Sequence, residues 1–252
     1  MSAPSTKAID LDHVRFRVPD LGAQSAFLSD FGFAVEHEGD RLIGVVGDGT
    51  PAYRAEAGDA RFLGFGLRVP GEGDLDRLEA SGAKRADDRG TRCAALRDPD
   101  GWEIRAVVRE SASQDAGIAR NEGGRFDRGT GRYAPPRGPA HIMRLGHIVL
   151  QVGDFQASSA FYQDTFGLLA SDEVETPDGS TLIGAFLRCD RGPSPADHHS
   201  VFLMQSPDGK ARFEHAAFEV RDIDSLMAGH EHLLEAKRDH AWGPPHPMAG
   251  NR

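Results

Sequence analysis

The stretch LDHVRFRVPDLGAQSAFLSD at residues 11–30 is repeated as LGHIVLQVGDFQASSAFYQD at residues 145–164. At this offset of 134 residues, nine of twenty positions are identical, and they include the pair His13 and His147. Both copies then run into a Phe-Gly pair and, further on, a Leu-Ile-Gly triplet. Identity at one fixed offset indicates internal duplication rather than coincidence of composition.

A shorter repeat of the same pattern occurs within each half of the chain. FLGFGLRV (62–69) and FEHAAFEV (213–220) both have the character of an opening strand, and each precedes a helix-like stretch, around 73–82 and 222–236. The repeating unit is therefore strand, helix and then several strands, and the chain contains it about four times. Alternation and β-branching predict further strands at 33–37, 41–46, 92–96, 103–108, 181–187 and 200–205.

The two halves are joined by a segment of different composition. Residues 111–143 are rich in Gly, Arg, Ser and Pro and have little apolar periodicity, which predicts a linker. We therefore expect an N-terminal domain of two modules at 1–110 and a C-terminal domain at 144–252.

Composition excludes several classes of protein. The 252 residues carry a net charge of −10, which argues against a nucleic-acid binder or a binder of anionic membranes. The sequence contains no run of about eighteen apolar residues, so no membrane span is predicted. The N-terminus has no apolar signal region, and the two cysteines read as reduced thiols, so we expect a cytoplasmic protein.

Four such units in two tandem halves resemble the vicinal oxygen chelate superfamily, which contains glyoxalases, bleomycin resistance proteins and extradiol dioxygenases. The two-domain layout is most similar to that of type I extradiol ring-cleaving dioxygenases, and the resemblance covers nearly the whole chain. It implies an α+β fold of tandem βαβββ modules that form two open cupped sheets, with a metal in the cup and the last module incomplete. The motifs that carry it are LGHIVLQV (145–152), HHSVFL (198–203), FEHAAFEVRDID (213–224) and HAWGPPH (240–246).

Two histidines stand at matching places in the C-terminal half. Strand alternation puts His147 and Val149 on one face of their segment, opposite the apolar residues, and gives His215 the equivalent position in its own strand. A single histidine on a strand is more often a core residue than a ligand. The matched pair instead favours two ligands of one metal, because two imidazoles and a carboxylate form the facial triad of non-haem Fe(II) oxygenases.

The resemblance also implies roles for other residues. His199 matches the acid–base histidine of the family, and an imidazole can exchange protons near neutral pH. His246 falls near a second catalytic histidine of the family, although the match requires a gap of one residue. Alternation predicts that Val149 and Val201 line the substrate cup, and His240 is a further candidate for substrate binding.

The N-terminal copy departs from the ligand pattern. Gly64 stands where the C-terminal half has its second histidine. The family's third ligand is a Glu seven residues after the Asp of an Asp-Pro-x-Gly turn, and counting from Asp98 reaches Arg105. A guanidinium remains protonated and cannot serve as a ligand. We therefore expect the N-terminal domain to be metal-free.

The function that this resemblance implies is extradiol cleavage of a catechol-type aromatic by O2 at a non-haem Fe(II) site, in aromatic compound catabolism. The expected partners are a small aromatic diol and O2, without nucleic acid or membrane. Family members often assemble, so a homo-oligomer is also an expectation.

The main departure from the family in the C-terminal half is the missing Glu ligand, because the strand that carries it in the family is not in this sequence. We expect a shortened dioxygenase, which is either a fragment, a chain without its tail, or a natural remnant that does not cleave rings. Two other functions stay open on the same fold. One is a non-catalytic protein that binds an aromatic ligand, and the other is a glyoxalase-like metal-dependent lyase or isomerase.

Overall fold

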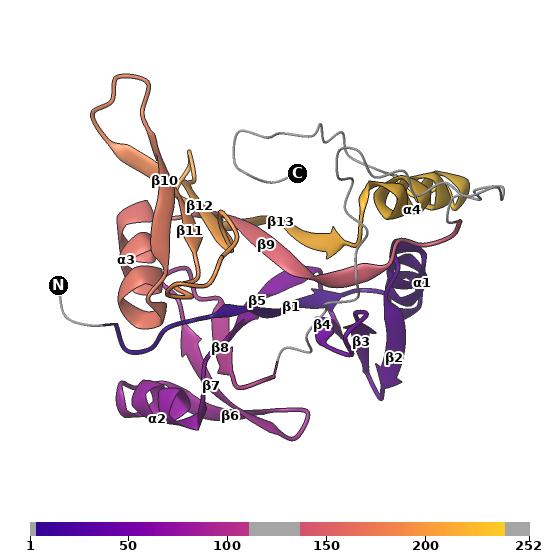
Figure 1. The fold of residues 1–252 in the computed structure, drawn as a ribbon, viewed down its shortest axis with the longest axis horizontal. Helices are drawn as coiled ribbons and strands as arrows, with labels where there is room; N and C mark the ends of the chain where they lie inside the picture. The colour runs from indigo at the N-terminus through magenta and orange to yellow at the C-terminus, as the bar shows by residue number, and fades with distance from the viewer. Residues whose placement is uncertain (1–3, 111–136, 240–252) are drawn as a thin grey trace.

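The computed structural model describes residues 4–110 and 137–239, which form two curled sheets with four helices (Figure 1). The first sheet has eight strands in the order β2-β3-β4-β1-β5-β8-β7-β6. The second has five strands in the order β10-β11-β12-β9-β13. The predicted α+β class and the two curled sheets of the vicinal oxygen chelate fold are confirmed.

The eight-stranded sheet consists of two complete βαβββ modules. Its elements are β1 (Asp10–Val18), α1 (Leu21–Phe31), β2 (Ala34–Glu38), β3 (Arg41–Val45), β4 (Pro51–Ala57), β5 (Arg61–Arg68), α2 (Glu72–Ala80), β6 (Lys84–Asp88), β7 (Thr91–Arg97) and β8 (Glu103–Val107). The opening strands β1 and β5 pair with each other in antiparallel fashion at the centre of the sheet, so the modules meet there.

The five-stranded sheet contains a third module and the described part of a fourth. Its elements are β9 (Ile142–Val152), α3 (Phe155–Phe166), β10 (Leu169–Glu175), β11 (Leu182–Arg188), β12 (Val201–Gln205), β13 (Arg212–Val220) and α4 (Ile223–Glu235). Strand β9 begins at Ile142, two residues before the predicted start of the C-terminal domain and within the predicted linker 111–143. Residues 111–136 of that linker lie outside the described residues.

Local capping explains which residues the duplication has kept. The carboxylates of Asp20 and Asp154 accept hydrogen bonds from backbone N–H groups at the starts of α1 and α3, at 2.9 and 3.0 Å. Gly32 and Gly167 end these helices with φ values of 119° and 65°, a left-handed conformation that glycine adopts without strain. The repeated Asp and Phe-Gly signals therefore mark the two ends of equivalent helices.

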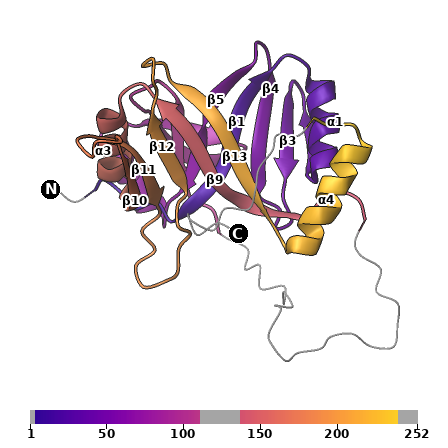
Figure 2. The same cartoon turned by 90° about the horizontal axis from the view of Figure 1, so that it is seen from above.

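The two sheets share one hydrophobic core. On β9, Ile148, Leu150 and Val152 are fully buried on the face turned toward the other sheet, as alternation predicts. Phe213 of β13 stacks on Phe62 of β5 with 4.4 Å between ring centroids. Figures 1 and 2 show β9 and β13 lying across β1 and β5, which leaves the opposite face of β9 and β13 for polar side chains.

A turn of the first sheet docks on the start of α3. The turn is Asp98-Pro99-Asp100-Gly101, and its Asp100 carboxylate accepts a hydrogen bond of 3.0 Å from the backbone N–H of Gly153. The Tyr162 hydroxyl donates to Asp98 at 2.8 Å. Burial raises the pKa of Asp98 to about 6. Within the described residues, no helix is long and apolar enough to cross a bilayer.

Candidate metal and substrate site

His147 and His215 meet on the polar face of the five-stranded sheet. Strands β9 and β13 are antiparallel neighbours in which Val149 lies opposite His215 and His147 lies opposite Ala217. The two histidines are therefore diagonal neighbours on one face. Their Nε2 atoms are 3.2 Å apart. With metal–nitrogen bonds of about 2.1 Å, this separation corresponds to an angle of about 100° at a shared metal, close to that of adjacent octahedral ligands.

The third ligand of a facial triad is not found among the described residues. There, no other His, Cys, Asp or Glu atom joins the two imidazoles in a group whose atoms all lie within 4.8 Å of one another. Glu219 lies on the same strand as His215 but forms an ion pair of 2.7 Å with Arg144. The residues in place thus fit two positions of the triad and leave the carboxylate position unfilled by this part of the chain.

His199 lies beside the pair. Its ring centroid is 4.5 Å from that of His147, and only 4% of the residue is exposed. The Nδ1 atoms of His199 and His198 are 3.2 Å apart, and His198 Nε2 lies 2.7 Å from a carboxylate oxygen of Asp172. Because a carboxylate only accepts, His198 donates to Asp172 through Nε2 and, when neutral, accepts from His199 at Nδ1. In this arrangement Nδ1 of His199 carries the proton and donates it to His198, so Nε2 is the acceptor nitrogen of His199.

The prediction that Val201 lines the cup is wrong. Val201 is fully buried and lies opposite Ile148 in the parallel pairing of β12 with β9, so it faces the shared core. Regular strand structure begins only at Val201, so alternation does not extend back to His199. The neighbouring Phe202 lies opposite Val149 and occupies the cup face instead.

The other predicted site residues have different outcomes. Val149 lies on the cup face beside His215 and is half-buried. His240 and His246 lie outside the described residues. His198, the first residue of the motif HHSVFL, contacts His199 directly.

Several residues at this site were not predicted. Phe186 stacks on Phe202 at 4.1 Å and presents its edge to His199 at 5.1 Å between ring centroids. Arg144 is held by Asp197 through two hydrogen bonds of 2.8 Å. The sequence did offer a signal for the two rings, because each of the predicted strands 181–187 and 200–205 contains a phenylalanine. Paired strands place such rings together.

A cavity of about 680 Å³ opens beside the histidines. Its walls include His147, His199 and apolar side chains from β13 and α4, among them Phe218 and Leu226. Ion-paired groups of Arg144 and Glu219 form its polar rim. The cavity combines an apolar wall with titratable imidazoles, which suits a small ring that carries polar substituents.

The equivalent place in the first sheet holds a different cluster. Ligand-type atoms of Asp12, His13 and Asp88 lie within 4.8 Å of one another, and all three residues are buried. The Asp12 carboxylate already binds Arg68 and Arg109, at 3.1 and 2.9 Å. Burial, followed by repulsion from a nearby guanidinium, lowers the pKa of His13 to about 3.

Arginines also surround the second carboxylate of this cluster. Asp88 forms ion pairs with Arg54, Arg105 and Arg109. Guanidinium groups therefore already neutralise both carboxylates. The metal-free state of this domain remains a prediction, and these pairings are the physical argument for it.

Gly64 differs from its counterpart His215 in backbone as well as in side chain. Its φ of 135° is a conformation that residues with a side chain rarely adopt. A Cβ at this position would collide with the carbonyl oxygen of Glu103 on the neighbouring strand β8. No side chain can therefore occupy the second ligand position in the first sheet without movement of β5 or β8.

Comparisons with known proteins agree with this architecture. The chain is 27% identical over 256 residues to metapyrocatechase 2 of Cupriavidus necator, covering 96% of this chain and 74% of that protein. Its fold is similar to that of the 2,3-dioxygenase LapB from Pseudomonas sp. KL28, with 17% identity, a TM-score of 0.75 and coverage of 97% and 86% of the two chains.

A second solved structure with a similar fold is the Mn(II)-bound glyoxalase from Novosphingobium aromaticivorans. It is 21% identical, has a TM-score of 0.72, and the match covers 98% of this chain and 77% of the glyoxalase. Residues 144–251 match the family described as the Glyoxalase/Bleomycin resistance protein/Dioxygenase superfamily. The chain therefore carries a domain of this superfamily and has the vicinal oxygen chelate fold.

Proposed function

We propose that this protein is an extradiol dioxygenase that cleaves a catechol-type aromatic with O2 at an Fe(II) held by His147 and His215. The observation that carries the proposal is the 3.2 Å separation of the two Nε2 atoms on matched strands. The similarity to metapyrocatechase 2 supports the choice of this reaction within the superfamily.

His147 and His215 would supply two of the three protein ligands, and a carboxylate from outside the described residues would supply the third. When bound at this site, ferrous iron supplies adjacent positions for the diol and O2 and the electron transfer between them. The imidazoles hold their donor atoms toward one point because their strands are hydrogen-bonded neighbours.

His199 is placed to move a proton. Its ring lies against that of His147, and the chain of contacts through His198 to Asp172 leaves its Nε2 as the acceptor. In this role, Nε2 takes the proton that a diol loses on binding and returns it during ring opening. Phe186 packs against the His199 ring and restricts its orientation.

The apolar wall of the cavity would exclude water from the aromatic ring. Phe218, Ile223 and Leu226 line it together with His147 and His199. An apolar ring gains roughly 25 cal/mol for each Å² of apolar surface that it buries. The substrate is therefore expected to be an aromatic diol rather than a sugar or an aliphatic polyol.

Oxygen consumption tests the proposal. The chain is loaded with Fe(II) without air, and catechol and O2 are then added while oxygen uptake and a yellow semialdehyde product are followed. The proposal expects uptake that depends on both histidines, with H147A and H215A as the variants. An iron-loaded protein that binds diol and consumes no oxygen would contradict it.

A non-catalytic protein that binds an aromatic ligand is the second candidate. The observation that favours it is the lack of a third ligand at the histidine pair within the described residues. Calorimetric titration with catechol separates the two functions. Binding that is unchanged by a metal chelator supports the second candidate, and binding lost with chelator supports the first.

A further inference from the structure

A second cavity lies in the eight-stranded sheet and shares no wall residue with the histidine site. Its volume is about 280 Å³. Five arginines line it together with four carboxylates, and Glu103, which is not part of the wall, forms ion pairs with two of these arginines. The arginines are Arg15, Arg41, Arg54, Arg89 and Arg105.

Most guanidinium groups in this cavity are paired, because Glu103 binds Arg15 and Arg105 and Asp88 binds Arg54. Two groups of donors in the cavity are not. The Arg41 side chain is exposed and forms no hydrogen bond or ion pair with any residue in the described part of the chain. Arg54 is only 8% exposed, and its Nη2 has no hydrogen-bond partner there. The Asp12 carboxylate lies 3.8 Å from that nitrogen, and Asp88 pairs with the other terminal nitrogen of Arg54. A buried donor without a partner is costly, so Arg54 sits in an environment that favours added negative charge.

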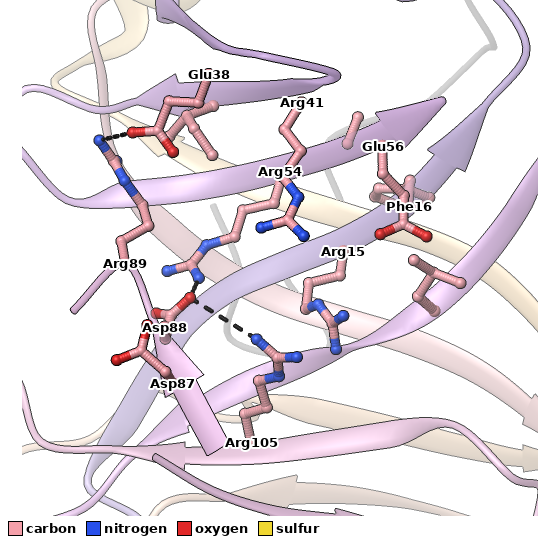
Figure 3. A pocket seen from close by; sticks show the side chains of 13 residues that line it. Arg15, Phe16, Glu38, Arg41, Arg54, Glu56, Asp87, Asp88, Arg89 and Arg105 are labelled. Atoms are coloured by element: carbon pink, nitrogen blue, oxygen red, sulfur yellow. Dashed lines mark ion pairs between the residues drawn. The ribbon is translucent and has the colours of Figure 1, made fainter. Parts of the chain in front are cut away.

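The guanidinium groups repel one another across the cavity. Figure 3 shows the side chains of Arg15, Arg41, Arg54 and Arg105 turned toward a common space. Burial lowers the pKa of Arg15, the charge of Arg105 lowers it further, and the ion pair with Glu103 offsets part of this shift. Burial likewise lowers the pKa of Arg54 to about 9, and the charges of Arg105 and Arg15 contribute to this shift. An anion in the cavity would relieve this repulsion.

The walls also define the kind of anion. Because most of the arginines already have carboxylate partners, few donors are left, which suits a monoanion better than a dianion such as phosphate. Guanidinium geometry suits a planar carboxylate, which can accept two parallel hydrogen bonds. Ile43, Ala55 and Leu63 add apolar surface to the wall. We propose that this cavity binds a small monocarboxylate with an apolar body, independently of the diol site.

Calorimetric titration of the full chain tests this proposal with three sodium salts at equal ionic strength: benzoate, phosphate and chloride. Benzoate is expected to bind saturably with one site per chain and more tightly than either other anion. The variant R41Q should weaken benzoate binding about tenfold, because it removes a charge-assisted hydrogen bond from an exposed residue that has no structural partner. Its thermal unfolding midpoint should not change.

Two controls separate this site from its alternatives. Lys84→Gln removes the same charge from an exposed residue of β6 that does not line the cavity, and should leave benzoate binding unchanged. The double variant H147A/H215A should retain it. The proposal is overturned if benzoate binds no better than chloride, if phosphate binds and benzoate does not, if R41Q has no effect, or if the double histidine variant loses benzoate binding.

Discussion

The Tyr162 hydroxyl donates a hydrogen bond of 2.8 Å to the Asp98 carboxylate and joins helix α3 of one sheet to a turn of the other. Both residues are buried. Burial raises the pKa of Asp98 to about 6 from a model-peptide value of 3.8, and the Tyr162 and Trp102 hydrogen bonds only partly offset this. The link between the sheets therefore contains a carboxyl group that binds its proton more tightly in the folded state.

This pKa shift predicts how stability changes with pH. Because the folded pKa of Asp98 is the higher one, its stabilising contribution is complete below about pH 3.8 and is lost as the pH rises through about 6. Asp98→Asn keeps an acceptor for Tyr162 and removes the titration. Between pH 4 and 7, the free energy of unfolding of the unaltered protein should fall by about 2–3 kcal/mol relative to this variant.

Urea denaturation at several pH values measures that difference. Asp59→Asn, at an exposed position, is the control and should follow the unaltered protein at every pH. Parallel pH profiles for the unaltered protein and the Asp98 variant would show that this carboxyl does not titrate as expected.

The histidine pair predicts where a divalent metal binds. If the proposed site is correct, removal of either His147 or His215 should weaken Mn(II) binding at least about 100-fold, because each would supply one of its two ligands in the described residues. Titration followed by electron paramagnetic resonance of Mn(II) reports this without any activity measurement. His37→Ala, at an exposed position, should bind as the unaltered protein does. Full Mn(II) binding in the double variant H147A/H215A would place the metal elsewhere.

Asp172 is predicted to act as a positioning residue through His198. Asp172→Asn should reduce diol turnover about tenfold and shift its pH profile, because the asparagine no longer requires His198 to carry its proton on Nε2. Nitrogen-15 spectra of the histidine rings report the tautomers of His198 and His199 directly. Glu173→Gln is the matched control on the same strand. If the tautomers of His198 and His199 are unchanged in the Asp172 variant, Asp172 does not position them.

The contact between Phe213 and Phe62 predicts coupling of the two sheets. Phe213→Ala should lower the free energy of unfolding by about 2–3 kcal/mol, at the low end for a Phe-to-Ala change because Phe213 is only partly buried. Leu169→Ala, where the side chain is 41% exposed, should cost less than about 1 kcal/mol. Chemical denaturation compares them, and equal losses would exclude a special contribution from the stacked rings.

The repeat alone predicted most of the fold, because its signals are local. A capping Asp, a terminal Gly and strand alternation act within a few residues, so the modules could be located without any knowledge of tertiary contacts. Strands β4, β6 and β10 were not predicted. Their sequences PAYRAEA, KRADD and LASDEVE are rich in charge, Ala or Pro, and pairing with neighbouring strands rather than their own alternation fixes them as strands.

The candidate site was less predictable, since it depends on strand register. His147 and His215 could be placed together because both lie within regular strands at equivalent positions. Val201 could not be placed correctly, because the irregular backbone before β12 breaks the alternation that would link it to His199. The arginine-lined cavity brings together residues from seven strands, β1 to β6 and β8, and a turn, and no short motif records such an arrangement.

The left-handed backbone at Gly64 limits what the first sheet can be engineered to bind. A histidine introduced there would meet the carbonyl of Glu103 and force β5 away from β8. A two-histidine site like that of β9 and β13 therefore cannot be built in the first sheet by substitution at this position alone.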